Sequence, residues 1–354
     1  MTDSVPAAAI KGSDEITDDE QSFSHQNSLE ILALQLAEDL RDVTRDGNHN
    51  PIPARIEQLS TFFKEAYHTF ENSGQGGENP SGAAEWILDN YFVLKQALRQ
   101  VEEGLPSDFY HNLPKVDIGG SKLPRVYSLA YALTQFSQNH LDMDRIRDFV
   151  ADFQSIVTLK IGEIWALPLF LRLSILELFA EALTRMIDLS LPASPSTLQP
   201  ASSSDSLSSS EIIAGQTLVA NSILSLRLLA TQDWKAFFEA TSKVDTVLWE
   251  DPAGVYSNMG FEAHNRYRDV IEALALASPL DEVSIAREAV ALAQAGDRPR
   301  SRHLGYYLID EGRPMLEARV QYQVPLGVRM RRWLYDHATL AYLGSITTLT
   351  ALIC

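Results

Sequence analysis

Hydrophobic residues recur every three or four positions along most of the chain, which is the spacing of one face of an α-helix. In the first half, clusters of Gly, Pro and Asn interrupt this pattern and separate successive helices. The helices predicted there begin at Leu29, Pro53 and Ser81 and continue with 126–136, 142–157 and 165–180. The last of these is apolar almost all round. Because it is short and contains Arg172, Glu177 and Pro168, we expect a buried central helix rather than a membrane span.

The second half repeats the helical pattern over 212–230, 234–249, 264–277 and 281–295, each bounded by Gly, Pro or an Asp cap. No alternating strand pattern of convincing length interrupts it, apart from a short candidate strand over 305–309. The predicted fold class is therefore all-α, with a multi-helix cytoplasmic region followed by the start of a transmembrane helix.

Changes in composition divide the chain into five parts. Residues 1–28 are acidic and poor in large apolar side chains, so they cannot offset chain entropy by burial and are predicted to be a disordered acidic tail. Residues 29–189 form a first helical domain. A Ser/Pro-rich linker or insertion over 190–210 precedes a second helical region over 211–325. Residues 326–354 combine a basic flank with an apolar run.

The apolar run over 338–354 contains no charged residue. A membrane helix needs about 20 residues, so we expect an incomplete transmembrane helix of a larger membrane protein, with the chain truncated in its first span. The flank carries basic residues, which favour the cytoplasmic side, and aromatic residues, which favour the headgroup level: Arg329, Arg331, Arg332, Trp333 and Tyr335. The alternative is a terminal helix that packs on a soluble domain.

The charge balance argues against a nucleic-acid partner. With 29 Lys and Arg against 47 Asp and Glu, the chain carries a net charge of −18 at pH 7 and would repel a phosphate backbone. The single cysteine, Cys354, excludes an intramolecular disulfide and a cysteine-based zinc site. The histidines include no pair at the spacing of a helical metal site, so we predict no metal site in this chain.

Few motifs point to catalysis. Asp142-Met143-Asp144 has the letters of the Asp-x-Asp metal site of glycosyltransferases, but it opens a helix, where a capping role is the better interpretation. The carboxylate pairs that would suit a glycosidase are Glu85 with Asp89 and Glu163 with Glu177. Such pairs also occur on ordinary helix faces. We therefore predict no catalytic residue and no cofactor for this segment.

One helical segment is a candidate carbohydrate contact. Trp86, Asp89 and Asn90 fall on adjoining faces of the helix that begins at Ser81, where an indole ring and polar side chains suit a sugar. In the alternative interpretation, Trp86 is a core residue, as we expect for Trp165, and the two polar side chains bond neighbouring backbone.

Seven short segments together resemble one protein family. In chain order they are AEWILDN (84–90), LPK (113–115) with PRVY (124–127), GEIWALP (162–168), NSI (221–223), DPAGVY (251–256) and HLGYYLI (303–309). Together they resemble the N-terminal region of bacterial cyclic β-1,2-glucan synthases, with the match covering residues 81–354.

The resemblance implies a helical region at the cytoplasmic face of the bacterial inner membrane. In that family it precedes membrane helices and a glycosyltransferase domain that uses UDP-glucose and a divalent metal, and then a phosphorylase-like domain. None of the family's transferase or phosphorylase residues has a counterpart in this chain. Two stretches depart from the family. The family usually continues its helices where this chain has the Ser/Pro-rich stretch 190–210. At 259–268, the family motif Met-Asp-Phe-x-Thr-Arg-Asp-x-Tyr-Arg reads MGFEAHNRYR in this chain.

We therefore expect a non-catalytic cytoplasmic region that scaffolds or regulates a membrane-bound glucan synthase. Its expected partners are the membrane, through the C-terminal apolar run, and the transferase and phosphorylase-like domains of that family. Two alternatives stay open: an autonomous helical carbohydrate-active enzyme or carbohydrate-binding module, and a helical protein-interaction adaptor. A carboxylate-lined pocket would favour the first, and a long apolar groove would favour the second.

Overall fold

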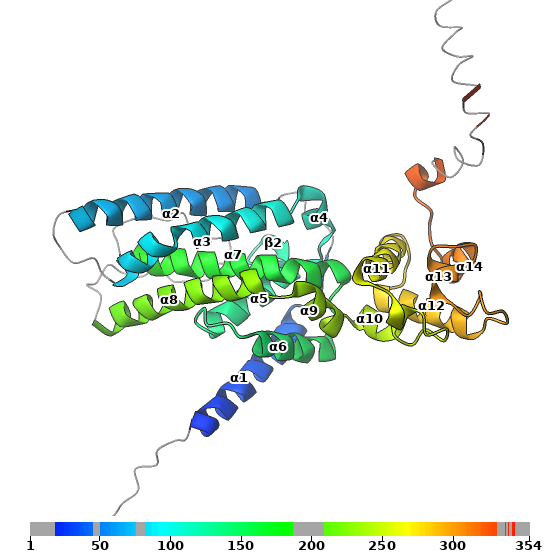
Figure 1. Cartoon of the computed structure of the whole chain (residues 1–354), viewed down its shortest axis with the longest axis horizontal. Helices are drawn as coiled ribbons and strands as arrows, with labels where there is room; N and C mark the ends of the chain where they lie inside the picture. The colour runs from blue at the N-terminus through cyan, green and yellow to red at the C-terminus, as the bar shows by residue number, and fades with distance from the viewer. Residues whose placement is uncertain are drawn as a thin grey trace, which may run out of the picture. The chain divides into compact units, whose positions relative to one another are not determined.

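A computed structural model describes residues 18–44, 50–75, 82–186 and 209–330, together with the single residues 337, 339, 342 and 343. This described part is almost entirely helical, which confirms the predicted all-α fold class. The chain divides into two compact units (Figure 1). Unit 1 is Met1–Thr158 with Gly162–Phe237, and unit 2 is Leu159–Ile161 with Phe238–Cys354.

Unit 1 is a helical bundle with one small hairpin. Its elements are α1 (Asp18–Asp39), α2 (Ile52–Gln75), α3 (Gly82–Gly104), α4 (Ser107–Asn112), β1 (Lys115–Ile118), β2 (Ser121–Pro124), α5 (Arg125–Phe136), α6 (Met143–Ile156), α7 (Ile161–Met186), α8 (Ser209–Thr231) and the first half of α9 (Trp234–Thr241). The long helices α2, α3, α7 and α8 run side by side (Figure 1). α3 packs against both α2 and α8, and α1 packs against α6.

The centre of unit 1 is α7, the helix predicted from the apolar run over 165–180. Almost all of its side chains are buried, and Phe179 lies with its ring centroid 5.4 Å from that of Phe63 on α2. Arg172 is tolerated there because its guanidinium donates hydrogen bonds to two backbone carbonyls, those of Pro168 and Leu229. The prediction of a buried central helix is confirmed. Trp165, however, is only half-buried.

Unit 2 is smaller and consists of short helices. They are the second half of α9, α10 (Lys243–Leu248), the 3₁₀ turn η1 (Tyr256–Asn258), α11 (Phe261–Leu276), α12 (Glu282–Gln294), α13 (Leu304–Leu308) and α14 (Arg313–Arg319). α12 contacts α10, α11, α13 and α14, so it is the central helix of this unit. Its inward face is made of small and branched residues such as Ile285 and Ala289, which allow close packing.

The hairpin β1–β2 was not predicted from the hydrophobic pattern. Its strands have four residues each, too short for an alternation to stand out, and they pair antiparallel from Lys115 opposite Pro124 to Ile118 opposite Ser121. The turn is Gly119-Gly120. Both glycines have positive φ, +60° and +85°, as a tight two-residue hairpin turn requires.

Two helical segments of unit 2 also differ from the prediction. The pattern over 234–249 forms two helices, because the Ser242 side chain accepts a hydrogen bond from the Asp245 backbone and so caps the start of α10. The candidate strand over 305–309 is wrong: this stretch forms α13. Leu304, Tyr307 and Leu308 are buried there, and so short an apolar run has no periodicity that separates strand from helix.

Two expected boundaries also move. The helix α1 begins at Asp18, within the predicted disordered tail, because a helix that is anchored by the packing of Leu29, Ala33 and Ala37 extends at little cost. The helix α8 includes Ser209 and Ser210 and packs on α3, which belongs to the same unit. The division between the two units therefore falls in α9 and not at 190–210. The remaining residues of both predicted segments, 1–17 and 190–208, lie outside the described residues.

Candidate functional site

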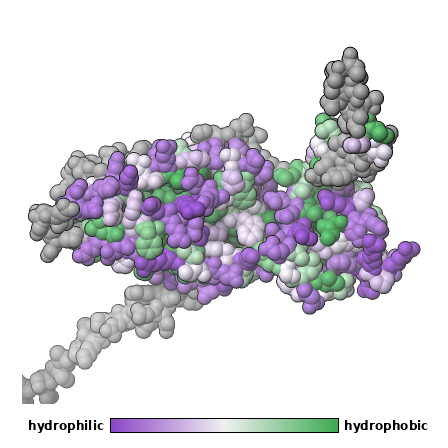
Figure 2. Space-filling model, turned by 45° about the horizontal axis from the view of Figure 1, so that its top comes forward, coloured by the Kyte–Doolittle hydropathy of each residue, from purple (hydrophilic) through white to green (hydrophobic). Residues whose placement is uncertain are grey.

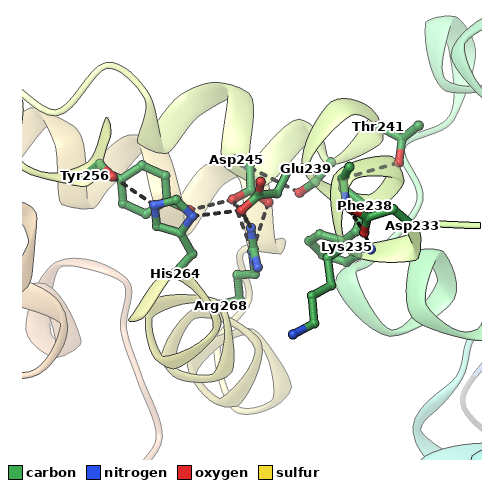
Figure 3. Close-up of polar contacts among 11 residues, drawn as sticks. Asp233, Lys235, Phe238, Glu239, Thr241, Asp245, Tyr256, His264 and Arg268 are labelled. Carbon is green, nitrogen blue, oxygen red and sulfur yellow. Dashed lines mark hydrogen bonds and ion pairs between the residues drawn. The ribbon is translucent and has the colours of Figure 1, made fainter. Parts of the chain in front are cut away.

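The densest polar cluster in unit 2 joins α9, α10, η1 and α11. Figure 3 shows Glu239, Asp245, Tyr256, His264 and Arg268 pointing toward one another, and we call these five residues the Asp245–Arg268 network. The guanidinium of Arg268 donates to both oxygens of Asp245, with Nη2 2.7 Å from Oδ1 and Nε 3.0 Å from Oδ2. Both side chains are fully buried. The guanidinium also lies over the ring of Phe238, 4.6 Å from its centroid.

The other members of the network surround this ion pair and add hydrogen bonds to it, although Nη1 of Arg268 is buried without a partner among the described residues. The Tyr256 hydroxyl donates to Oδ1 of Asp245 at 2.5 Å. The two ring nitrogens of His264 lie 2.8 Å from the Tyr256 carbonyl and 2.9 Å from Oε1 of Glu239, and the imidazole stacks on the Tyr256 ring at 4.1 Å between centroids. Of the five side chains, Glu239 keeps contact with solvent, being 31% exposed.

Two members of the network have shifted pKa values. Burial, followed by the charge of Asp245, raises the pKa of the Tyr256 phenol far above its ordinary value. Burial lowers the pKa of Arg268, but the hydrogen bonds and charge of Asp245 outweigh it and leave that pKa raised. Tyr256 therefore stays neutral and Arg268 stays charged near neutral pH, and a buried charge pair of this kind holds helices together. We therefore assign the network a structural role.

Beside the network, Asp251 organises the loop that follows α10. Its Oδ2 accepts from the backbone nitrogens of Val255 and Tyr256, each at 3.0 Å, and its Oδ1 accepts from the Leu304 nitrogen at 3.3 Å. Nδ1 of His303 lies 3.6 Å from Oδ2. One buried carboxylate thus joins the loop over 251–256 to the start of α13.

The loop and α13 border a pocket of about 430 Å³ within unit 2, which we call the Tyr306 pocket. It is lined by Ala253, Val255, Tyr267, Pro299, Arg300, His303, Gly305, Tyr306, Ile309 and Asp310. At one wall the Tyr267 hydroxyl and Nε2 of His303 are 3.3 Å apart. At another, the guanidinium of Arg300 is bound by Asp310, with Nη2 2.8 Å from Oδ2. The pocket therefore combines aromatic rings with hydrogen-bonding groups.

The predicted carbohydrate contact on α3 remains a prediction. Trp86 is half-buried, Asp89 is exposed and Asn90 is buried. Both ends of the Asn90 amide are engaged: its nitrogen donates to the Trp86 carbonyl at 2.9 Å, and its oxygen accepts from Nη2 of Arg227 on α8 at 2.5 Å. The bond to the Trp86 carbonyl is the kind that the structural interpretation of this segment expects, and the bond from Arg227 also connects α3 to α8.

The predicted membrane flank lies mostly outside the described residues. Arg329 is in a short helical stretch that the structure describes as far as Met330, while Arg331, Arg332, Trp333 and Tyr335 are not described. Within the described ranges, one stretch, Ile213–Thr231 of α8, is long and apolar enough to cross a membrane, with a mean hydropathy of 1.3. Core helices of soluble proteins share this composition, so α8 supports membrane contact only weakly.

The second carboxylate pair considered for catalysis, Glu163 with Glu177, has structural partners. Glu163 binds Arg125 through two hydrogen bonds, of 2.9 and 2.5 Å. Glu177 accepts from Nε of Arg55 at 2.8 Å and from the Tyr127 hydroxyl at 2.7 Å. These bonds occupy both carboxylates, which are buried, so Glu163 and Glu177 do not form an acid/base pair.

The Asp142 side chain accepts from the backbone nitrogens of residues 144 and 145, which confirms its capping role at the start of α6. Among the residues that the structure describes, no group of three or more His, Cys, Asp or Glu side chains could hold a metal ion.

The pocket and the network were missed as sites by sequence reasoning, although a signal was present. Three segments considered for the family resemblance, 251–256, 259–268 and 303–309, supply most of their residues. Within 259–268, His264 and Arg268 belong to the network and Tyr267 lines the pocket. The segments are far apart in the chain, so only folding shows that they meet.

Comparison with known proteins finds similarity to a glucan synthase. No family model matches the chain. The cyclic β-(1,2)-glucan synthase NdvB of Rhizobium meliloti (strain 1021) is 28% identical to it in an alignment 315 residues long. The match covers 70% of this chain and 11% of that protein. The chain thus spans about a ninth of the length of the curated relative that it matches. We conclude that this chain is related to the cyclic β-(1,2)-glucan synthases.

Proposed function

We propose that this chain is a non-catalytic, helical cytoplasmic region of a cyclic β-(1,2)-glucan synthase-like glycosyltransferase, in which it scaffolds or regulates glucan synthesis. The observation that carries the proposal is the similarity to a cyclic β-(1,2)-glucan synthase, which extends over 70% of this chain and a small part of that protein. A segment shared over so small a fraction of a synthase is better suited to a supporting role than to the whole reaction.

The chemistry of the described residues supports the non-catalytic part of the proposal. Glycosyl transfer from a nucleotide sugar needs a metal-binding carboxylate set or an acid/base pair. The buried carboxylates Glu163, Glu177 and Asp245 are each bound by an arginine, and Asp251 is bound by backbone nitrogens. Their charges are used to hold helices together, so UDP-glucose and its divalent metal would be bound by other domains of such a synthase.

The proposed location is the cytoplasmic face of the bacterial inner membrane. The basic and aromatic flank at 329–335, the uncharged run over 338–354 and the apolar helix α8 support contact with a membrane. The partners would be the membrane and the transferase and phosphorylase-like domains of the same synthase. Deleting 338–354 is expected to move the chain to the soluble fraction of a cell lysate. A full-length chain that is already soluble and monomeric would contradict the membrane part of the proposal.

A chimera tests the main claim. In the R. meliloti synthase, the segment that matches this chain is deleted or replaced by this chain, and the cyclic glucan made by membranes is measured. Deletion should lower glucan production and replacement should restore it. Undiminished production by the deletion variant would overturn the scaffold or regulatory role.

A second assay tests the absence of catalysis. The purified chain should not consume UDP-glucose with or without Mg²⁺ or Mn²⁺. Turnover that is abolished by a carboxylate substitution within the chain would show that it is itself an enzyme.

A further inference from the structure

The Tyr306 pocket is not used by any part of the function proposed above. We propose that it binds one neutral glucopyranosyl residue of a glucan chain, so that the module senses or holds the product of the synthase. This inference rests on the proposed function for the identity of the sugar. The pocket's own geometry supplies the argument for a neutral sugar over a nucleotide.

An aromatic ring supplies the apolar surface. Tyr306 lines the pocket and is only partly buried. Its ring is held from two directions. Tyr307 approaches it edge-on, with centroids 5.0 Å apart, and Gly312 lies so close that a β-carbon there would be 2.5 Å from Cδ1 of the ring. A fixed aromatic ring that borders open space is suited to pack against the C–H groups of a pyranose.

The polar groups at the same wall suit hydroxyls. Arg300 lies with its guanidinium 5.9 Å from the centroid of the Tyr306 ring and is bound by Asp310. A carboxylate accepts from sugar hydroxyls and a guanidinium donates to them. Because the ion pair is preformed, both groups are already oriented when a ligand arrives.

The charge of this wall disfavours a phosphate. Among the described lining residues, one is an arginine, Arg300. Its Nη2 lies 2.8 Å from Oδ2 of Asp310, and its Nη1 lies 3.5 Å from Oε2 of Glu311. Asp310 balances the single positive charge of Arg300, and Glu311, which is not a lining residue, adds a negative charge beside the pair. A nucleoside diphosphate would therefore find no uncompensated arginine in the described lining, whereas an uncharged sugar needs none.

A second part of the lining depends on the absence of a side chain at Gly305. Tyr267 and His303 meet at 3.3 Å beside Gly305, where a β-carbon would be 2.3 Å from the Tyr267 hydroxyl and 2.8 Å from Nε2 of His303. Glycine at 305 thus lets a phenol and an imidazole both reach the pocket. Small-molecule sites typically measure about 300–1,000 Å³, and this pocket, at about 430 Å³, is within that range.

The test measures ligand binding to the full chain by saturation-transfer NMR and calorimetry. The probes are a β-1,2-linked glucotriose, UDP-glucose and UDP. The variants are Tyr306→Ala, Asp310→Asn and Tyr306→Phe, with Tyr322→Ala as a control outside the pocket. Asp310 is largely exposed, so its substitution does not endanger folding.

The glucotriose should bind the unmodified chain with millimolar affinity. Tyr306→Ala and Asp310→Asn should each weaken binding by about tenfold or more, while Tyr306→Phe and Tyr322→Ala leave it unchanged. UDP should not compete. No binding at about 10 mM glucotriose, equal weakening by Tyr322→Ala, or displacement by UDP would each overturn the proposal. None of these results depends on turnover or on glucan synthesis, so a failure here is distinct from a failure of the proposed function.

Discussion

Replacing Asp245 by Asn should destabilise unit 2 more than any substitution of an exposed charge. Asp245 and Arg268 are both fully buried, and Asp245 also accepts from the Tyr256 hydroxyl. An asparagine of nearly the same shape keeps one acceptor oxygen, but it loses the charge and turns an amide group toward the guanidinium. Arg268 is then a buried cation whose nearest remaining carboxylate is Glu239, at 3.3 Å.

The expected cost follows from these contacts. Removing one partner of a buried ion pair costs about 3–5 kcal/mol, because the other charge stays desolvated. Glu239 is partly exposed and compensates only in part, so we expect about 3 kcal/mol for Asp245→Asn and a larger value for Asp245→Ala. The double variant Asp245→Asn/Arg268→Met should be more stable than Asp245→Asn alone, since it removes the uncompensated charge.

This cost is measured by unfolding the chain in urea, with hydrogen exchange of peptides from α11 and α12 as the readout for unit 2. The matched control is Glu288→Gln in the same unit, which breaks an exposed ion pair with Arg319 and should cost less than about 1 kcal/mol. Equal effects of Asp245→Asn and Glu288→Gln, or a double variant less stable than the single one, would refute the reasoning.

Three further outcomes are expected. Gly305→Ala should lower the free energy of unfolding by about 1–3 kcal/mol, because the added β-carbon would be 2.3 Å from the Tyr267 hydroxyl. Gly260→Ala, where the β-carbon would meet open space, should leave the free energy of unfolding unchanged. Equal effects of the two substitutions in a urea titration would contradict this. Ser242→Ala should cost about 1 kcal/mol through loss of the α10 cap, seen as faster amide exchange at the start of that helix. Burial raises the pKa of Tyr110 and of Tyr267 to about 12 from 10.0. The contribution of these neutral phenols to stability is therefore intact below pH 10 and is lost as the pH rises through about 12. Melting temperatures that stay constant over this interval would exclude such a loss.

Sequence alone determined the fold class and the positions of the long helices. The apolar periodicity is strong in α3, α6 and α11, where three or more turns repeat the same face, and the structure places these helices close to the predicted ranges. The Asp142 cap was also readable, because its partners are the next few backbone nitrogens. Local interactions of this kind need no tertiary information.

Tertiary structure decided the short elements and the sites. The four-residue strands and the five-residue α13 contain too few positions for a period, so the contacts that bury them determine their conformation. Asp245 and Arg268 are 23 residues apart, and Tyr267 and His303 are 36 apart. No local rule pairs residues at such separations, because the pairing follows from how α10, α11 and α13 pack around α12. For the same reason Glu163 and Glu177, candidate acids by composition, become the buried partners of Arg125 and Arg55.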